Sequence, residues 1–334
     1  MSSPDPQALA RQHYLVQTEL AAAAAAGVVG LLAAFDMTDI DSSWAAISGP
    51  VVELIASYQL AAALGSAAFF VALLRAADLA PRPEATVPPL AFAGYTAAGD
   101  SVATVVDVAP ILMKVGIARA NEVTSPAVSA LPAVPTETAP TPSRLPLPQA
   151  QVEQAALQAA TARVARIAAS EVHDAGTGMT EAQMRLEPQA SGYVRHVTLP
   201  ACDRCLILAG RVYSASTGFL RHPQDDCVMV PYFGDQVPKL QSPRDLFHLM
   251  TDAQQDRAFG AAGARAIRDG ADLSTVTNAK RGMNAPGEEY TRTAAPGART
   301  RRHGPRRLSP QGVARRAGDD TVLYRRLLRE HGYI

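Results

Sequence analysis

The sequence has 334 residues, enough for two domains of ordinary size, and 48% of them are apolar, enough for a hydrophobic core. Its three cysteines cannot close a disulfide framework, which excludes a disulfide-stapled secreted domain. The formal net charge is zero, but residues 1–150 carry 6 basic against 12 acidic side chains and residues 280–334 carry 13 against 5, so the basic end suggests an electrostatic partner such as nucleic acid.

Residues 6–119 are predicted to form a set of helices, with breaks at Gly49-Pro50 and in the segment 80–89. Two apolar runs, 21–35 and 60–74, are each 15 residues long. A helix needs about 20 such residues to cross a bilayer. We therefore predict buried helices of an N-terminal helical domain over 1–123, and neither a membrane segment nor a signal peptide.

A Pro-rich segment, 124–148, holds seven prolines in 25 residues and is the predicted domain boundary. A helix is expected to begin after it and to end at Gly176, with a second short helix capped by Thr180. Residues 192–199 alternate in polarity and predict a strand. Residues 205–214 read as a small hairpin that turns at Ala209-Gly210, and residues 227–230 as a further short strand.

The C-terminal third is again predicted to be helical. Helix starts are expected at Ser242-Pro243, at Thr251, at Ser309-Pro310 and at Asp320. The helix that follows Thr251 is expected to continue to Gly270, and residues 281–307 contain too much Gly, Pro and Arg to form a core. This gives a domain over 149–280, a basic linker over 281–307 and short helices over 308–334.

The predicted fold class is mainly α with a small β element (α+β). It consists of an N-terminal helical bundle followed by a helical domain with an inserted zinc-knuckle-like hairpin, at residues 200–230.

All three cysteines lie within 26 residues, in the pattern C-x2-C-x16-H-x4-C. Cys202, Cys205, His222 and Cys227 are four sulfur and nitrogen ligands, the number that a closed tetrahedral zinc site needs, and Asp225 is a fifth, oxygen, candidate. A small region with little apolar mass would gain much of its folding free energy from such an ion. The sequence therefore predicts a structural zinc site.

Three alternatives remain for the cysteines. A redox pair would open a helix after a strand, whereas a strand is predicted after Cys205. The stretch 200–205 is similar to half of the zinc-deaminase motif, but the upstream His173 and His196 lack the glutamate that this chemistry requires. In the third alternative, the thiols are small buried apolar groups with no ion.

Catalytic motifs are not found: the sequence has neither a Gly-rich phosphate loop nor a G-x-S-x-G elbow, so we predict that the protein is not an enzyme. The basic end concentrates five arginines within nine residues: Arg299, Arg301, Arg302, Arg306 and Arg307. Arginines at this density bind phosphates through forked donors, so they are candidate DNA ligands. The alternative is a solvated linker.

The order of these features resembles the phage Mu F-like head morphogenesis (minor capsid) proteins. The resemblance runs from the strand 192–199 through the C-x2-C pair and His222-Pro223 to Cys227, and continues in 262–283 and 307–334. Where the family has a cysteine in its H-P-x-C-x-C pattern, this chain has Asp225, so an oxygen would replace one sulfur of the family's site.

The resemblance implies a structural virion protein of a tailed bacteriophage or prophage. Such a protein would lie inside the head at the portal, assist head assembly and DNA packaging or ejection, and be made in the host cytoplasm. Its expected partners are the portal protein, other head proteins and packaged double-stranded DNA, with no small-molecule substrate. The alternatives left open are a capsid maturation protease and a host nucleic-acid-binding zinc protein.

Overall fold

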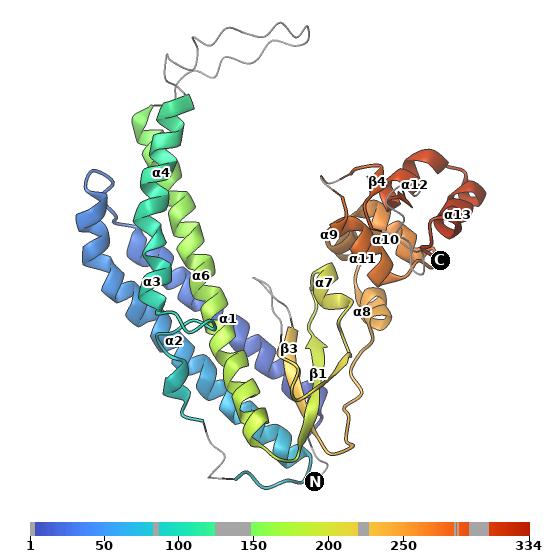
Figure 1. The fold of residues 1–334 in the computed structure, drawn as a ribbon, viewed down its shortest axis with the longest axis horizontal. Helices are drawn as coiled ribbons and strands as arrows, with labels where there is room; N and C mark the ends of the chain where they lie inside the picture. Colours follow the sequence, from blue (N-terminus) through green and yellow to red (C-terminus); the bar gives the residue numbers. More distant parts are fainter. Residues whose placement is uncertain are drawn as a thin grey trace, which may run out of the picture. The chain divides into compact units, whose positions relative to one another are not determined.

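The computed structural model describes residues 4–82, 87–123, 148–219, 227–283, 285, 287–293 and 307–334, which form two compact units (Figure 1). The helical unit comprises Leu15–Ala72 and Ala80–Leu186. The mixed unit comprises Met1–Tyr14, Leu73–Leu79 and Glu187–Ile334. Helices dominate and a small antiparallel sheet accompanies them, which confirms the predicted mainly α class with a small β element.

The helical unit is built from long helices joined by short connections. Its elements are α1 (Pro6–Leu32), α2 (Ile40–Ala76), the 3-10 helix η2 (Pro89–Phe92), α3 (Val102–Val106), α4 (Val108–Val123) and α6 (Gln149–Leu186). The N-terminal end of α1, up to residue 14, and the C-terminal end of α2, from residue 73, belong to the mixed unit. Helices α4 and α6 lie side by side (Figure 1). The segment 124–147 between them is outside the described residues, and the division between the two units falls after Leu186.

The core of the helical unit consists mostly of small apolar side chains. Buried members include Ala21, Ala24, Val28, Val51, Ala62, Val106, Ala109, Ala160, Val164, Ala168 and Val172. Trp44, the single tryptophan of the chain, is also buried, and its Nε1 donates to Asp107 Oδ1 at 2.8 Å. Small side chains on facing helices allow the helix backbones to approach closely. The unit is therefore stabilised mainly by close contact between helices and less by the burial of large side chains.

Two helix ends expected from the sequence are wrong. Helix α2 continues through Gly49-Pro50, and α6 continues through Gly176 as one helix of 38 residues. An interior proline costs a helix about 3 kcal/mol. Because Trp44 and Val51 are buried on either side of Pro50, burial of both halves of α2 offsets this cost.

Gly176 is explained by a close contact rather than by a helix end. The Gln17 side chain is buried, and its Nε2 donates to the Ala62 carbonyl at 2.9 Å and to Ser66 Oγ at 3.4 Å. A Cβ atom on Gly176 would lie 2.5 Å from Gln17 Oε1 and 3.0 Å from Ser66 Oγ. A side chain at position 176 would therefore displace the buried Gln17 amide.

Alanine at position 176 is expected to destabilise the helical unit by about 1–3 kcal/mol, because the new methyl group displaces the buried Gln17 amide. Alanine ordinarily stabilises a helix relative to glycine by up to about 1 kcal/mol, so Gly30→Ala in α1, where a Cβ meets nothing within 4 Å, is the matched control with the opposite sign. Urea unfolding followed by Trp44 fluorescence measures the free energy of unfolding of both variants. Equal stabilisation by the two substitutions would contradict the packing argument.

Helices α1 and α2 are long and apolar enough to cross a membrane by length and composition alone. They have 27 and 37 residues, and the mean hydropathy of their most apolar stretches is 1.7 and 1.6. Of the residues in those stretches, 28% in α1 and 39% in α2 are buried. Core helices of soluble proteins can also be this long and apolar, so the absence of a membrane segment remains a prediction.

A three-stranded antiparallel sheet begins the mixed unit after α6. Strand β1 (Ala190–Val197) is central, between β2 (Val212–Ser214) and β3 (Cys227–Phe233). This confirms the strands predicted at 192–199 and 227–230. Tyr193 is fully buried on β1 and stacks on Tyr213 of β2, with ring centroids 4.9 Å apart.

The hairpin predicted over 205–214 is wrong in its first half. Residues Asp203–Leu206 form a helical turn, α7, and Cys205 and Leu206 are buried by it. The chain does turn at Gly210, whose φ of 69° suits glycine, but β2 then pairs with β1 instead of with residues 205–208. The apolar run 205–208 is too short for its pattern of apolar residues to distinguish a helix from a strand.

Helices fill the rest of the mixed unit. They are α8 (Pro243–Leu249), α9 (Asp252–Phe259), α10 (Ala261–Arg268), α11 (Leu273–Arg281), α12 (Pro310–Ala317) and α13 (Thr321–Glu330), with the two-residue strands β4 (Tyr290–Thr291) and β5 (Arg307–Leu308). The four predicted caps are confirmed, because the side chains of Ser242, Thr251, Ser309 and Asp320 each accept a backbone N–H. The helix expected to run to Gly270 is instead split at Gly260, which has a φ of 76°.

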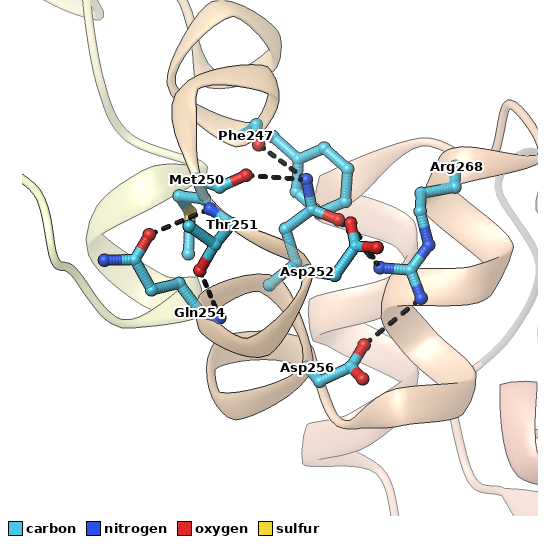
Figure 2. Close-up of polar contacts among 8 residues, drawn as sticks. Phe247, Met250, Thr251, Asp252, Gln254, Asp256 and Arg268 are labelled. Atoms are coloured by element: carbon cyan, nitrogen blue, oxygen red, sulfur yellow. Dashed lines mark hydrogen bonds and ion pairs between the residues drawn. The ribbon is translucent and has the colours of Figure 1, made fainter.

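A buried glutamine ties the first three of these helices together. Gln255 of α9 donates through Nε2 to the carbonyls of Phe247, at 2.9 Å, and Met250, at 3.3 Å. Its Oε1 accepts from Arg268 of α10 at 2.8 Å, and Arg268 also contacts Asp256 at 3.2 Å (Figure 2). The polar contacts satisfy an amide that is 5% exposed, so this cluster has a structural role.

The predicted linker 281–307 is in part folded. Among its described residues, β4 pairs with β5, and Thr291 is buried with its Oγ1 donating to the Ala279 carbonyl at 2.8 Å. A Cβ on Gly312 of α12 would lie 2.1 Å from the Glu289 carbonyl oxygen, so the segment packs tightly on that helix. Residues 294–306 lie outside the described part of the chain.

Candidate functional site

Three of the five predicted metal ligands lie in the described part of the chain. Cys202, Cys205 and Cys227 are not joined in a disulfide, and the latter two are buried. His222 and Asp225 lie outside the described residues. Among the residues that are described, no group of three or more His, Cys, Asp or Glu side chains could hold a metal ion. The predicted ligand set therefore remains a prediction.

Cys202 and Cys205 are positioned by the start of α7. Cys202 is the N-cap, and its Sγ accepts the backbone N–H of Cys205 at 3.4 Å. Cys205, one turn along, is 1% exposed.

Cys227 begins β3, where it is the backbone neighbour of Val197, the last residue of β1. Only four residues separate Val197 from Cys202. Because β1 and β3 are antiparallel, the topology brings Cys202 and Cys227 to the same end of the sheet. The Sγ of Cys227 accepts a hydrogen bond from Arg195 Nη1 at 3.0 Å.

Cys202 and Cys227 share two local features. Both Cys202 and Cys227 accept N–H hydrogen bonds, as metal-bound thiolates do, and their strands and turn meet at one end of the sheet. Zinc, when bound, would crosslink this region without redox chemistry. Cys202, Cys205 and Cys227 would supply sulfur ligands and His222 the nitrogen.

Around the C-x2-C pair, the structure differs from the sequence prediction. The C-x2-C pair does follow a strand and open a helical turn, contrary to the strand predicted after Cys205. However, α7 has four residues and the sheet is antiparallel with the order β2-β1-β3. A thioredoxin-like unit instead places the pair at the start of a full helix in a βαβ unit, so the redox alternative gains no support.

Arg307 does not belong to the predicted DNA-binding set. Its side chain is 7% exposed, its Nε donates to the His331 carbonyl at 2.7 Å, and its guanidinium carbon lies 4.1 Å from the centre of the Tyr333 ring. Burial lowers the pKa of Arg307. This arginine therefore holds the end of α13 and is not available to phosphate. The other four arginines of the set, Arg299, Arg301, Arg302 and Arg306, lie outside the described residues.

Burial shifts the pKa values of two titratable groups, His196 and Glu171. Burial lowers the pKa of His196 on β1 to about 4, so its ring is neutral at physiological pH, and it is hydrogen-bonded to Thr198 at 3.2 Å. Burial, and secondarily the neighbouring Asp174, raises the pKa of Glu171 on α6 to about 7, against the opposing hydrogen bond from the Ala97 backbone. Gln59, beside Glu171, holds the same loop by donating to the Tyr95 carbonyl at 2.8 Å.

Arg195, which is 3% exposed in the central strand, is not among the residues predicted from the sequence. Alternation along β1 puts Arg195 on the same face as Tyr193 and Val197, both buried. A charged residue between two buried apolar ones was the signal that could have found it.

Comparison with known proteins gives no relative for this chain. No protein-family description, no curated protein and no solved structure matches it.

Proposed function

We propose that the protein is a non-enzymatic minor head protein of a tailed bacteriophage or prophage. It associates with the portal inside the head and assists head assembly and DNA packaging or ejection. Its partners are the portal protein, other head proteins and packaged DNA, which places it in the virion, after synthesis in the host cytoplasm.

One observation carries this proposal: the order and topology of the cysteine motif. A strand, a C-x2-C pair and a second strand that begins at Cys227 follow one another, and the two strands pair antiparallel with Val197 opposite Cys227. This is the order of features on which the resemblance to the Mu F-like head proteins rests. A zinc-braced knuckle fixes the shape of a small surface, which suits a component that docks on other head proteins.

The basic segment supports a contact with DNA. Arg299, Arg301, Arg302 and Arg306 remain the candidate phosphate ligands after the removal of Arg307. Arginine–phosphate contacts of this kind release counterions, so the affinity for DNA should fall steeply as salt rises.

The test is made in the phage or prophage that encodes the chain. Purified particles are expected to contain the protein, and deletion of its gene is expected to leave portal and coat protein made but few heads filled with DNA. Mass spectrometry of the particles and electron microscopy of the heads measure these outcomes. Absence of the protein from particles, with normal heads after deletion, would refute the proposal. Cleavage of scaffold or coat protein by the purified chain would instead favour a maturation protease.

A further inference from the structure

The last two helices of the mixed unit have the form of a helix-turn-helix. Helix α12 has 8 residues, α13 has 10, and residues 318–320 join them. Gly318 in this turn has a φ of 53°, which favours glycine, and its backbone N–H donates to the Ala314 carbonyl at 3.0 Å. In Figure 1 the two helices run in clearly different directions on either side of the turn. Two helices joined in this way are a common DNA-binding motif, in which the second helix contacts the duplex.

The inner faces of both helices are fixed to the rest of the mixed unit. Val313 and Ala317 of α12 and Tyr324 and Leu328 of α13 are buried. The guanidinium carbon of Arg265, in α10, lies 4.2 Å from the centre of the Tyr324 ring. The outer face of α13 is therefore presented on a rigid support, as a binding surface requires.

The outer face of α13 carries three arginines. Arg325 and Arg326 have side chains that are 60% and 67% exposed, and Arg329, also exposed, follows them by four and three residues. This spacing puts the three guanidinium groups on one side of the helix. Val322, one turn earlier on the same side, is exposed as well. A face with three forked N–H donors is complementary in charge to the phosphate backbone of a nucleic acid.

The stability of α13 explains only part of this charge. Of the three arginines, only Arg329 lies in the last turn, where a cation stabilises a helix through its dipole. Arg325 pairs with Asp269 at 3.3 Å, and Arg326 pairs with Glu330 at 3.7 Å. Exposed ion pairs of this kind stabilise a protein little, so phosphates can replace the two carboxylates.

Acidic groups in the turn restrict the contact to the later part of α13. Asp319 and Asp320 are exposed, and Asp320 caps the helix by accepting the backbone N–H groups of Val322 and Leu323. The distance along the helix axis from Asp320 to Arg329 is about 14 Å. A phosphate backbone is therefore expected along the last two turns of α13 and not at its start.

The residues of this surface favour a duplex over a single strand. Surfaces that bind single-stranded nucleic acids stack the bases on exposed aromatic rings. Residues 307–334 are all described, and the only Phe, Tyr or Trp residues among them, Tyr324 and Tyr333, are both buried. The surface therefore offers cations for a phosphate backbone and no aromatic ring for stacking.

We propose that α12 and α13 form a docking surface for double-stranded DNA, in which Arg325, Arg326 and Arg329 bind phosphates. The contacts are with the backbone, so the binding is independent of DNA sequence. This surface is additional to the four candidate arginines between residues 299 and 306. The inference goes beyond the proposed function, because it does not depend on a role in a phage head.

The test compares DNA binding by variants of the full chain. One variant carries Arg325→Gln, Arg326→Gln and Arg329→Gln, and a second replaces the same three residues with lysine. The matched control removes three exposed arginines of the helical unit, through Arg119→Gln, Arg163→Gln and Arg166→Gln. The affinity for a short DNA duplex is measured by fluorescence anisotropy at several salt concentrations, and circular dichroism verifies folding.

The expected result is a change in the salt dependence of binding. Each phosphate contact contributes about 0.9 to the slope of log affinity against log salt concentration, so the glutamine variant should lose about 2.7 from that slope. The lysine variant and the control should keep the wild-type slope, because the former retains the charges and the latter retains the surface. A folded glutamine variant with the wild-type slope would overturn the inference, and so would an equal loss in the control.

Two further outcomes bear on the partner. Tighter binding of single-stranded DNA, or of phosphatidylglycerol vesicles, than of the duplex would overturn double-stranded DNA as the occupant of this surface. A wild-type chain that does not bind the duplex would overturn the surface and every DNA contact of this chain. The presence of the protein in phage particles, which tests the proposed function, is measured separately and would not be affected.

Discussion

Replacing Gly192 with alanine is expected to destabilise the mixed unit by about 3 kcal/mol, because the new methyl group has no space in the sheet. An added Cβ would lie 2.1 Å from the Tyr213 carbonyl oxygen on β2 and 2.9 Å from the Tyr232 hydroxyl on β3. The first of these is backbone, so the contact is relieved only by moving β2 away from the central strand. The expected result is loss of the sheet that carries Arg195 and Cys227.

Tyrosine near-ultraviolet circular dichroism during urea unfolding measures this effect. The matched control is Gly218→Ala, since a Cβ at that position meets nothing within 4 Å. Trp44 lies in the core of the helical unit, so its fluorescence transition provides an internal reference that should move little. A Gly192→Ala protein as stable as Gly218→Ala would show that β2 does not approach β1 as described.

Replacing Cys202 with alanine is expected to reduce bound zinc from about one ion per chain to little or none. A structural zinc site needs four ligands, and the free energy of zinc binding, on the order of 10 kcal/mol, adds to folding. The mixed unit of the variant should therefore unfold at lower urea concentration. Elemental analysis after dialysis against metal-free buffer gives the stoichiometry.

The control for this substitution is Arg204→Ala, because Arg204 is exposed between the two cysteines of the pair. It should retain zinc. A wild-type protein that contains no zinc, or a Cys202→Ala protein that retains it in full, would contradict the metal site. The thiols would then be small buried apolar groups, the alternative considered from the sequence.

Local signals predicted much of the fold correctly. Ser242, Thr251, Ser309 and Asp320 each cap a helix as expected, because a side-chain oxygen that meets the first free N–H groups needs no tertiary partner. The alternation over 192–199 predicted the strand correctly, although residues 192–197 of β1 are all buried rather than alternately buried and exposed.

The errors arise where contacts distant in sequence decide the outcome. Gly176 signals a helix end by itself, but the Gln17 side chain from α1 makes it a position without room for a Cβ. Arg307 belongs to a basic run, yet the carbonyl of His331 and the ring of Tyr333 hold it in the interior. In both cases the deciding partner lies more than 20 residues away.

In the candidate site, too, local sequence patterns could be recognised and contacts distant in sequence could not. The spacing of Cys202, Cys205 and Cys227 made these cysteines candidate ligands from the sequence alone. The contact of Arg195 with Cys227 could not be predicted in this way, because it joins residues 32 positions apart that the pairing of β1 with β3 brings together.

The alanine-rich interior of the helical unit limits how that unit can change over evolution. Positions such as Ala24, Ala62 and Ala160 are fully buried, and any larger residue there has to push two helices apart. Exchange for glycine is the remaining option, and it weakens the helix. Substitutions should therefore accumulate on the outward helix faces, while the spacing between helices is inherited almost unchanged.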